Sequence, residues 1–146
     1  MISANIRPIA ICVVRRGGDI FVFEALDSIK GETFYRPLGG GIEFGEHSDQ
    51  AVRREMMEEL GVELIQLRQI GVLENIFIYE GKPGHEIVFV FQADFNDRAL
   101  YDRELSICKE DNNTQLPAMW KPFEEFVSGR AILYPDGLAD LLRKNG

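Results

Sequence analysis

The stretch from Gly40 to Val62 constrains the fold most, because a glycine-rich run there leads directly into a segment with the periodicity of an amphipathic helix. We expect this helix to span roughly Ser48 to Leu60. At about 100° per residue, three glutamates project from about one third of the helix circumference, namely Glu55, Glu58 and Glu59. An apolar stripe occupies an adjoining arc, at Val52, Met56 and Leu60. One helix can therefore pack against a core and present acidic side chains to a cleft.

The clustered glutamates predict a site for a divalent cation. Like charges at i, i+3 and i+4 cost about a few tenths of a kcal/mol per pair in an isolated helix, and a bound cation would reverse that cost. Mg²⁺ and Mn²⁺ prefer carboxylate oxygens and water, and Mg²⁺ commonly takes one or two carboxylates together with substrate phosphates. The glycines at positions 39, 40, 41 and 45 allow the backbone to approach such a phosphate closely. Three glutamates alone would favour a simpler interpretation, a solvated acidic face on an amphipathic helix.

The spacing of the whole segment overturns that simpler interpretation, because it resembles the Nudix box at nine defining positions within 23 residues. These positions are Gly40, Glu46, Arg54, Glu55, Met56, Glu58, Glu59, Gly61 and Val62. The flanking strands and the region around Trp120 also look like that family, much less specifically. The resemblance implies an α/β fold, a Nudix-type α/β/α sandwich with a mixed β-sheet and a loop–helix–loop catalytic motif, formed by one Nudix hydrolase domain over residues 1–146.

The resemblance also implies a role for each matching side chain. In Nudix hydrolases the residues that match Glu55, Glu58 and Glu59 bind the catalytic metal ions, which we expect to be Mg²⁺ or Mn²⁺. The arginine that matches Arg54 orients the neighbouring acids through a salt bridge, and Glu46 helps to brace the loop and helix or joins the outer metal shell. We therefore predict Glu55, Glu58 and Glu59 as metal ligands, and Glu55, Glu59 and Arg54 as members of the catalytic site.

The predicted reaction is hydrolysis of a pyrophosphate bond, by in-line attack of a metal-activated water on one phosphorus of a nucleoside diphosphate derivative. The products are a nucleoside monophosphate and a phosphorylated fragment. Nucleoside triphosphates and dinucleoside polyphosphates are the predicted substrates. ADP-ribose or another nucleotide sugar is an alternative, and so is a noncatalytic nucleotide-binding sensor. The intact glutamates favour an enzyme, because a sensor would be expected to lose them.

The general base is left open between a box glutamate such as Glu55 and an acid from elsewhere in the chain. Candidates outside the box are Glu86, in a predicted strand, and Glu110 or Asp111, in the polar connection before Trp120. Nudix enzymes often place an additional catalytic glutamate in that connection, so the resemblance favours Glu110. Each of these acids also fits the ordinary role of a solvated surface carboxylate.

The substrate-binding residues predicted from the sequence are Gly40, Gly41 and Tyr79. Aromatic faces can stack on a nucleobase, and the candidates are Phe34, Tyr35, Tyr79 and Trp120, although each also fits a place in the core. Among family members, the ADP-ribose type often has a proline where this chain has Phe77, and dinucleoside polyphosphate hydrolases often have a tyrosine near the position of Tyr79. The resemblance therefore disfavours ADP-ribose mildly.

Composition limits the partners of the chain. With 146 residues and 45% hydrophobic residues, we expect one domain with a real core. The formal net charge of −8 opposes binding to nucleic-acid backbones and to anionic membranes, so the predicted partner is a small phosphorylated nucleotide. The two cysteines, Cys12 and Cys108, are distant in sequence and predict reduced thiols and a cytoplasmic location. The apolar run from Ile9 to Val14 is too short to span a membrane. A homodimer is expected only by analogy with the family.

Apolar patterning predicts the remaining elements. Two strands and an extended segment precede the box, at Ile6–Val14, Ile20–Ala25 and Phe34–Arg36. A long hairpin follows the box, formed by Leu64–Tyr79 and Glu86–Phe95. The stretch from Asn96 to Pro117 lacks clear periodicity and predicts a partly mobile connection. Two short helices are expected near the C-terminus, at Pro122–Val127 and Asp136–Arg143.

Overall fold

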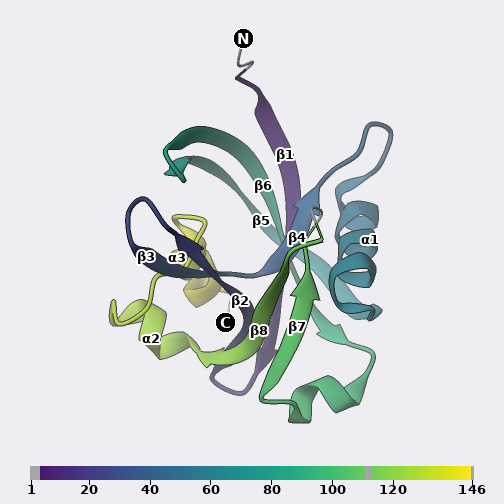
Figure 1. Cartoon of the computed structure of the whole chain (residues 1–146). Helices are drawn as coiled ribbons and strands as arrows, with labels where there is room; N and C mark the ends of the chain where they lie inside the picture. The colour runs from purple at the N-terminus through teal and green to yellow at the C-terminus, as the bar shows by residue number, and fades with distance from the viewer. Residues whose placement is uncertain (1–3, 111–112, 146) are drawn as a thin grey trace.

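The computed structural model describes residues 4–110 and 113–145 (Figure 1). Its strands are β1 (Ile6–Arg16), β2 (Asp19–Asp27), β3 (Glu32–Arg36), β4 (Leu38–Gly41), β5 (Leu64–Tyr79), β6 (Lys82–Phe95), β7 (Leu105–Lys109) and β8 (Gln115–Pro122). Its helices are α1 (Ser48–Leu60), the 3₁₀ helix η1 (Arg98–Asp102), α2 (Phe123–Val127) and α3 (Leu138–Lys144). No helix in this described part is long and apolar enough to cross a bilayer.

The strands form one mixed sheet of eight, in the order β5-β6-β1-β2-β8-β7, with β3 attached to β2 and β4 attached to β1. The pairing of β1 with β6 is parallel, from Ile6 opposite His85 to Val14 opposite Ala93, whereas the other strand pairs are antiparallel. Strand β1 therefore lies near the centre of the sheet, where it pairs with β2, β4 and β6.

Two hydrophobic cores lie on the two faces of this sheet. In Figure 1, α1 lies on one side of the strands, and α2 and α3 lie on the other. Alternate residues of β1 contribute to both cores: Ala10, Cys12 and Val14 to the core of α1, and Ile9, Ile11 and Val13 to the core of α2 and α3. Because successive side chains of a strand point to opposite faces, a strand buried on both sides has a continuous apolar run, as β1 does. The predicted α/β/α sandwich with a mixed sheet is confirmed.

Helix α1 has the boundaries that the sequence predicts. At its start, the side chain of Gln50 accepts a hydrogen bond from the backbone N–H of His47 at 2.9 Å. At its end, Gly61 adopts a left-handed conformation with φ of 73°. Its N–H donates to the carbonyl oxygens of Met56 and Met57, at 3.2 and 3.0 Å. Glycine stops the helix here because it adopts positive φ without a steric penalty from Cβ.

The prediction for residues 96–117 was wrong, because this stretch contains η1, β7 and the beginning of β8. In β7 two apolar side chains, Leu105 and Ile107, are exposed together with Lys109, whereas Cys108 is fully buried. The usual alternation of apolar inward and polar outward residues is therefore inverted and does not identify the strand. Backbone pairing with β8, from Leu105 opposite Met119 to Lys109 opposite Gln115, defines β7 instead.

Candidate active site

Strand β4 brings the glycine-rich segment between β1 and α1. Gly39 and Gly40 lie opposite Ile11 and Ala10 of β1 in the antiparallel register. A Cβ atom at Gly39 would overlap the carbonyl oxygen of Ala10 and the Cα atom of Ile11, and one at Gly40 would lie 2.5 Å from the carboxyl carbon of Glu55. Only glycine therefore lets the backbone of β4 fit between a neighbouring strand and the acidic face of the helix.

Arg54 gathers the carboxylates on the exposed side of this site. Its Nε and Nη2 atoms donate to the two carboxylate oxygens of Glu46 at 2.8 and 2.9 Å, which is a bidentate contact. Nη2 also donates to the carbonyl oxygen of Gly41 at 2.9 Å, and Nη1 donates to Glu55 at 3.0 Å and to Glu58 at 3.3 Å. Arg54 thus joins the loop before the helix to the helix itself, as the predicted bracing role of Glu46 requires.

These contacts change the acidity of both partners. The hydrogen bonds from Arg54, with a further one from the N–H of Glu43, lower the pKa of Glu46 to about 2. Reciprocally, the hydrogen bond to Glu46 and then those to Glu55 and Glu58 raise the pKa of Arg54. The pair is therefore fully charged at neutral pH.

Glu59 and Glu55 lie deeper, and each is only 3% exposed. Glu59 Oε1 accepts a hydrogen bond from the N–H of Gly39 at 2.9 Å, and Oε2 receives none from the described residues. Burial, followed by the nearby carboxylates of Glu110 and Glu55, raises the pKa of Glu59. Glu110 follows β7, so the chain after that strand delivers a third acid to the two buried glutamates of the helix.

The donor chemistry of this site fits a hard divalent cation. Buried carboxylate oxygens that repel one another, one of them without a hydrogen-bond donor, are stabilised by a bound cation and are the ligands that Mg²⁺ and Mn²⁺ prefer. In the described part of the chain, no three His, Cys, Asp or Glu side chains already converge as a complete metal site. Glu58 turns toward Arg54, and its side chain is half exposed. The assignment of Glu55, Glu58 and Glu59 as ligands therefore stays a prediction.

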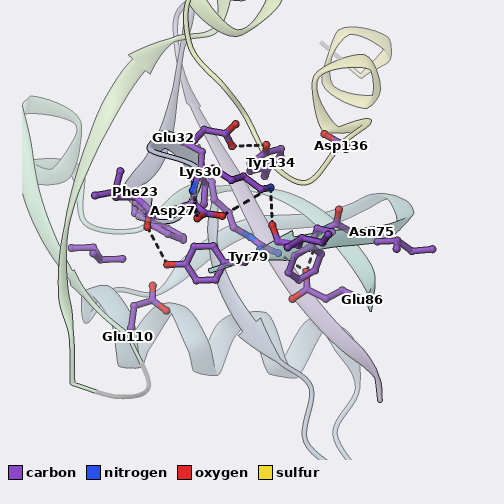
Figure 2. Close-up of a pocket in the computed structure, with 18 of the residues that line it drawn as sticks. Phe23, Asp27, Lys30, Glu32, Asn75, Tyr79, Glu86, Glu110, Tyr134 and Asp136 are labelled. Carbon is purple, nitrogen blue, oxygen red and sulfur yellow. Dashed lines mark hydrogen bonds and ion pairs between the residues drawn. The ribbon is translucent and has the colours of Figure 1, made fainter. Parts of the chain in front are cut away.

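Two cavities have Glu110 in their lining. The larger one has a volume of about 940 Å³ and lies among the β2–β3 turn, the β5–β6 hairpin and the segment between β7 and β8 (Figure 2). Its aromatic lining consists of Phe23, Phe34, Phe77, Tyr79 and Tyr134. The smaller one, of about 120 Å³, includes Gly39 and Gly40 in its lining. Five residues line both cavities, namely Arg7, Phe23, Arg36, Glu86 and Glu110. These five, which we call the throat, connect the box to the larger cavity.

The predicted site residues divide between those that meet in the site and those that do not. Tyr79 lines the larger cavity, and its hydroxyl donates to the carbonyl oxygen of Leu26 at 3.3 Å. Phe34 lies beside it, with the ring centroids 5.8 Å apart. Glu86 and Glu110 belong to the throat. Asp111 lies outside the described residues.

Trp120 and Tyr35 cannot stack on a base in this cavity, which corrects their candidacy. Trp120 is 8% exposed, donates from Nε1 to the carbonyl oxygen of Leu100 at 3.0 Å and stacks on the ring of Tyr101. Tyr35 packs against Phe126 in the opposite core. Both rings lie on strand faces that pack against a hydrophobic core. The sequence did not reveal this, because strand register cannot be read from a single segment.

Sequence reasoning missed several polar members of the cavity lining, among them Arg7, Asn75 and Tyr134. Asn75 is 4% exposed in the middle of β5, and Tyr134 donates from its hydroxyl to Glu32 at 2.7 Å. The available signal for Asn75 was a polar amide on the same strand face as Leu73 and Phe77. No local sequence pattern identifies Arg7 or Tyr134 as a lining residue, because only tertiary packing brings them to the cavity.

The chain matches the NUDIX domain over residues 5–140. The chain belongs to the NUDIX family of hydrolases. It is 39% identical over 115 residues to the NAD-capped RNA hydrolase NudC of Pasteurella multocida, covering 77% of this chain and 40% of that protein. The chain spans about two-fifths of the length of the curated relatives it matches.

Solved structures share the fold at low sequence identity. A NUDIX hydrolase from Nitrosomonas europaea aligns with a TM-score of 0.68 and 15% identity, over 97% of this chain and 88% of that one. A MutT NUDIX hydrolase from Burkholderia pseudomallei aligns with a TM-score of 0.60 and 20% identity, over 82% of this chain and 85% of that one. The predicted family and fold are therefore confirmed.

Proposed function

We propose that this chain hydrolyses a pyrophosphate bond in a small nucleoside diphosphate derivative, with a divalent metal ion. The observation that carries this proposal is the meeting of Glu55, Glu59 and Glu110 beside Gly39 and Gly40. These glycines line the smaller cavity, and the throat joins it to the larger cavity of about 940 Å³, which is large enough for a nucleotide. Nucleoside triphosphates and dinucleoside polyphosphates are the proposed substrates, and ADP-ribose or another nucleotide sugar is the alternative within the same chemistry.

The metal-binding role falls to the box glutamates. Glu55, Glu58 and Glu59 would hold Mg²⁺ or Mn²⁺, and the bound ion would supply positive charge to the phosphates and make a water molecule more acidic. Arg54 keeps Glu55 and Glu58 oriented through its hydrogen bonds. The closely packed glycines Gly40 and Gly41 let phosphate oxygens approach the backbone.

Glu110 is the proposed proton acceptor. Its carboxylate neighbours Glu59, and it comes from outside the helix, so it can face the attacking water from a second direction. Water oxygen forms the new bond to phosphorus, the bridging P–O bond breaks, and its electrons leave with the departing phosphate. Tyr79 offers an aromatic wall to the base in the larger cavity.

The partners proposed are small. The relative from Pasteurella multocida is named for hydrolysis of NAD-capped RNA, but a net charge of −8 on this chain opposes a long nucleic-acid backbone. We also propose that the chain is cytoplasmic and forms one domain, with a homodimer as the expected assembly by family analogy. A noncatalytic sensor is the second candidate, because the cavity alone would suit nucleotide binding.

The test is product formation from nucleoside triphosphates, dinucleoside polyphosphates and nucleotide sugars, with Mg²⁺, Mn²⁺ or a chelator. We expect metal-dependent release of a nucleoside monophosphate. Glu59→Gln should lower turnover on the order of a hundred-fold or more while the protein stays folded, and Mn²⁺ binding measured by calorimetry should weaken in parallel. Glu74→Gln, an exposed glutamate of β5, is the matched control. Full turnover by Glu59→Gln would refute the metal assignment, and nucleotide binding without turnover across the panel would favour the sensor.

A further inference from the structure

The throat lies between the smaller and the larger cavity, and a nucleotide would fill both. On one side the smaller cavity reaches Gly39 and Gly40, and on the other the larger cavity holds the aromatic side chains. A nucleotide with its phosphates at the glycines and its base among the aromatic rings would place its sugar in the throat. This inference rests on the proposed function, which sets that orientation.

Glu86 is a rigidly held carboxylate in this throat. It is 7% exposed, and its Oε1 atom accepts hydrogen bonds from Arg36 Nη2 at 3.0 Å and from Asn75 Nδ2 at 3.3 Å. Both hydrogen bonds that the described residues donate to Glu86 fall on Oε1, and Glu86 lines both cavities. In the view of Figure 2, Glu86 lies beside Asn75, with Tyr79 between it and Glu110. One oxygen of Glu86 is thus anchored and the other is left to accept from a ligand.

The chemistry of that oxygen limits what it can bind. An ionised carboxylate only accepts hydrogen bonds, so it attracts hydroxyl and N–H donors and repels phosphate. In the middle of a nucleotide the available donors are the sugar hydroxyls. Dinucleotide-binding folds recognise the ribose 2′-hydroxyl with an acidic side chain in the same chemical way. The phosphates are better served by Arg7, whose guanidinium packs over Gly41, with Nη2 2.8 Å from where a Cβ would be.

We propose that Glu86, held by Arg36 and Asn75, accepts a hydrogen bond from the ribose 2′-hydroxyl and makes this protein selective for ribonucleotides over 2′-deoxyribonucleotides. Arg36 and Asn75 are positioning residues, because they fix the carboxylate and leave its second oxygen toward the sugar. Glu86 therefore determines specificity and takes no part in breaking the phosphate bond.

The experiment compares each ribonucleoside triphosphate with its 2′-deoxy counterpart in kcat/KM, and AMP with 2′-deoxy-AMP in Kd by calorimetry. A hydrogen bond to a charged acceptor predicts a preference of about ten- to hundred-fold for the ribose form in both measurements. Wild-type protein that binds and hydrolyses both forms equally would overturn the inference and leave the proposed function standing. Absence of all turnover would refute the proposed function, and the binding comparison would then decide the inference.

The variant Glu86→Gln separates sugar recognition from other roles. With Oε1 held as before, the amide nitrogen replaces Oε2 and cannot accept from a hydroxyl. We expect the ribose preference, measured as the ratio of kcat/KM for the two sugars, to fall toward one, chiefly through the KM of the ribonucleotide. The control Glu74→Gln should keep the wild-type preference. An equal loss for both sugars, or a change in base preference with the sugar preference intact, would overturn the assignment, and the wild-type comparison remains decisive if the variant does not fold.

Discussion

Glu46 and Arg54 link the loop before α1 to the helix, and their ion pair has a consequence for stability in acid. Folded Glu46 has a pKa of about 2, below its ordinary value of 4.5, because Arg54 donates two hydrogen bonds to it. The unfolded chain binds this proton first as the pH falls. The pair therefore stabilises the fold above pH 4.5, and that contribution disappears as the pH falls toward 2.

We expect Glu46→Gln to lower the free energy of unfolding at pH 7, and its difference from the wild type to shrink steadily below pH 4.5. Urea unfolding of both proteins at pH 7, 4 and about 3 measures that difference. Glu74→Gln controls for the change from acid to amide at an exposed site. A difference that stays constant across this range would contradict the role of the ion pair.

Both cysteines are free thiols shielded by packing. Cys12 and Cys108 are 2% and 0% exposed, and burial raises the pKa of Cys108 to about 12 and that of Cys12 further. Because the thiolate is the reactive form, we expect neither thiol to react promptly with a disulfide reagent at pH 8 in the native protein. Both should react in guanidinium. Rapid reaction of either thiol with the reagent in the native protein would show that the core around that cysteine opens.

At the scale of elements, the close contact among β1, β4 and α1 distinguishes two neighbouring glycines. In Gly39→Ala the added methyl group would clash with the backbone of β1, which cannot move without breaking strand pairing. We therefore expect destabilisation of about 1–3 kcal/mol or more. In Gly40→Ala the added methyl group would clash only with the side-chain carboxylate of Glu55, which can move. We therefore expect a smaller loss of stability and a large loss of turnover.

Thermal unfolding and steady-state kinetics of the two variants check this contrast. Gly17→Ala is a matched control at a turn where no neighbouring atom lies within 4 Å, and it reports the cost of positive φ alone. Equal stability and full activity of Gly40→Ala would contradict the contact between β4 and Glu55.

At the scale of the whole molecule, Trp120 reports on one core and the backbone reports on all strands. Because β1 contributes side chains to both cores, we expect the two cores to unfold together. Fluorescence of the single tryptophan and far-ultraviolet circular dichroism should give coincident urea transitions. Two separated transitions would contradict the proposal of one domain. Because Trp120 is buried, we also expect nucleotide binding to leave its fluorescence emission nearly unchanged.

The local part of the site was predictable from the sequence. The boundaries of α1, which ends at Gly61, follow from spacing within one continuous segment. The family resemblance implied that Arg54 forms a salt bridge with neighbouring acids, and the structure pairs it with Glu46. The connection after β6 was not predictable, because β7 exposes Leu105 and Ile107 and is defined by its partner strand. Two of the four aromatic candidates, Tyr35 and Trp120, failed for the same reason, because strand register placed their rings in the cores and not in the cavity.

The sequence by itself determined the helix with its acidic and apolar faces, since side chains at i, i+3 and i+4 must share a face whatever surrounds them. It also determined the family, through the box that this helix carries. Only the tertiary structure decided which distant side chains join that helix. The parallel pairing of β1 with β6 sets Arg7 opposite Glu86, and the segment after β7 places Glu110 beside Glu59. Such meetings depend on register between segments far apart in the chain, and no local periodicity encodes that register.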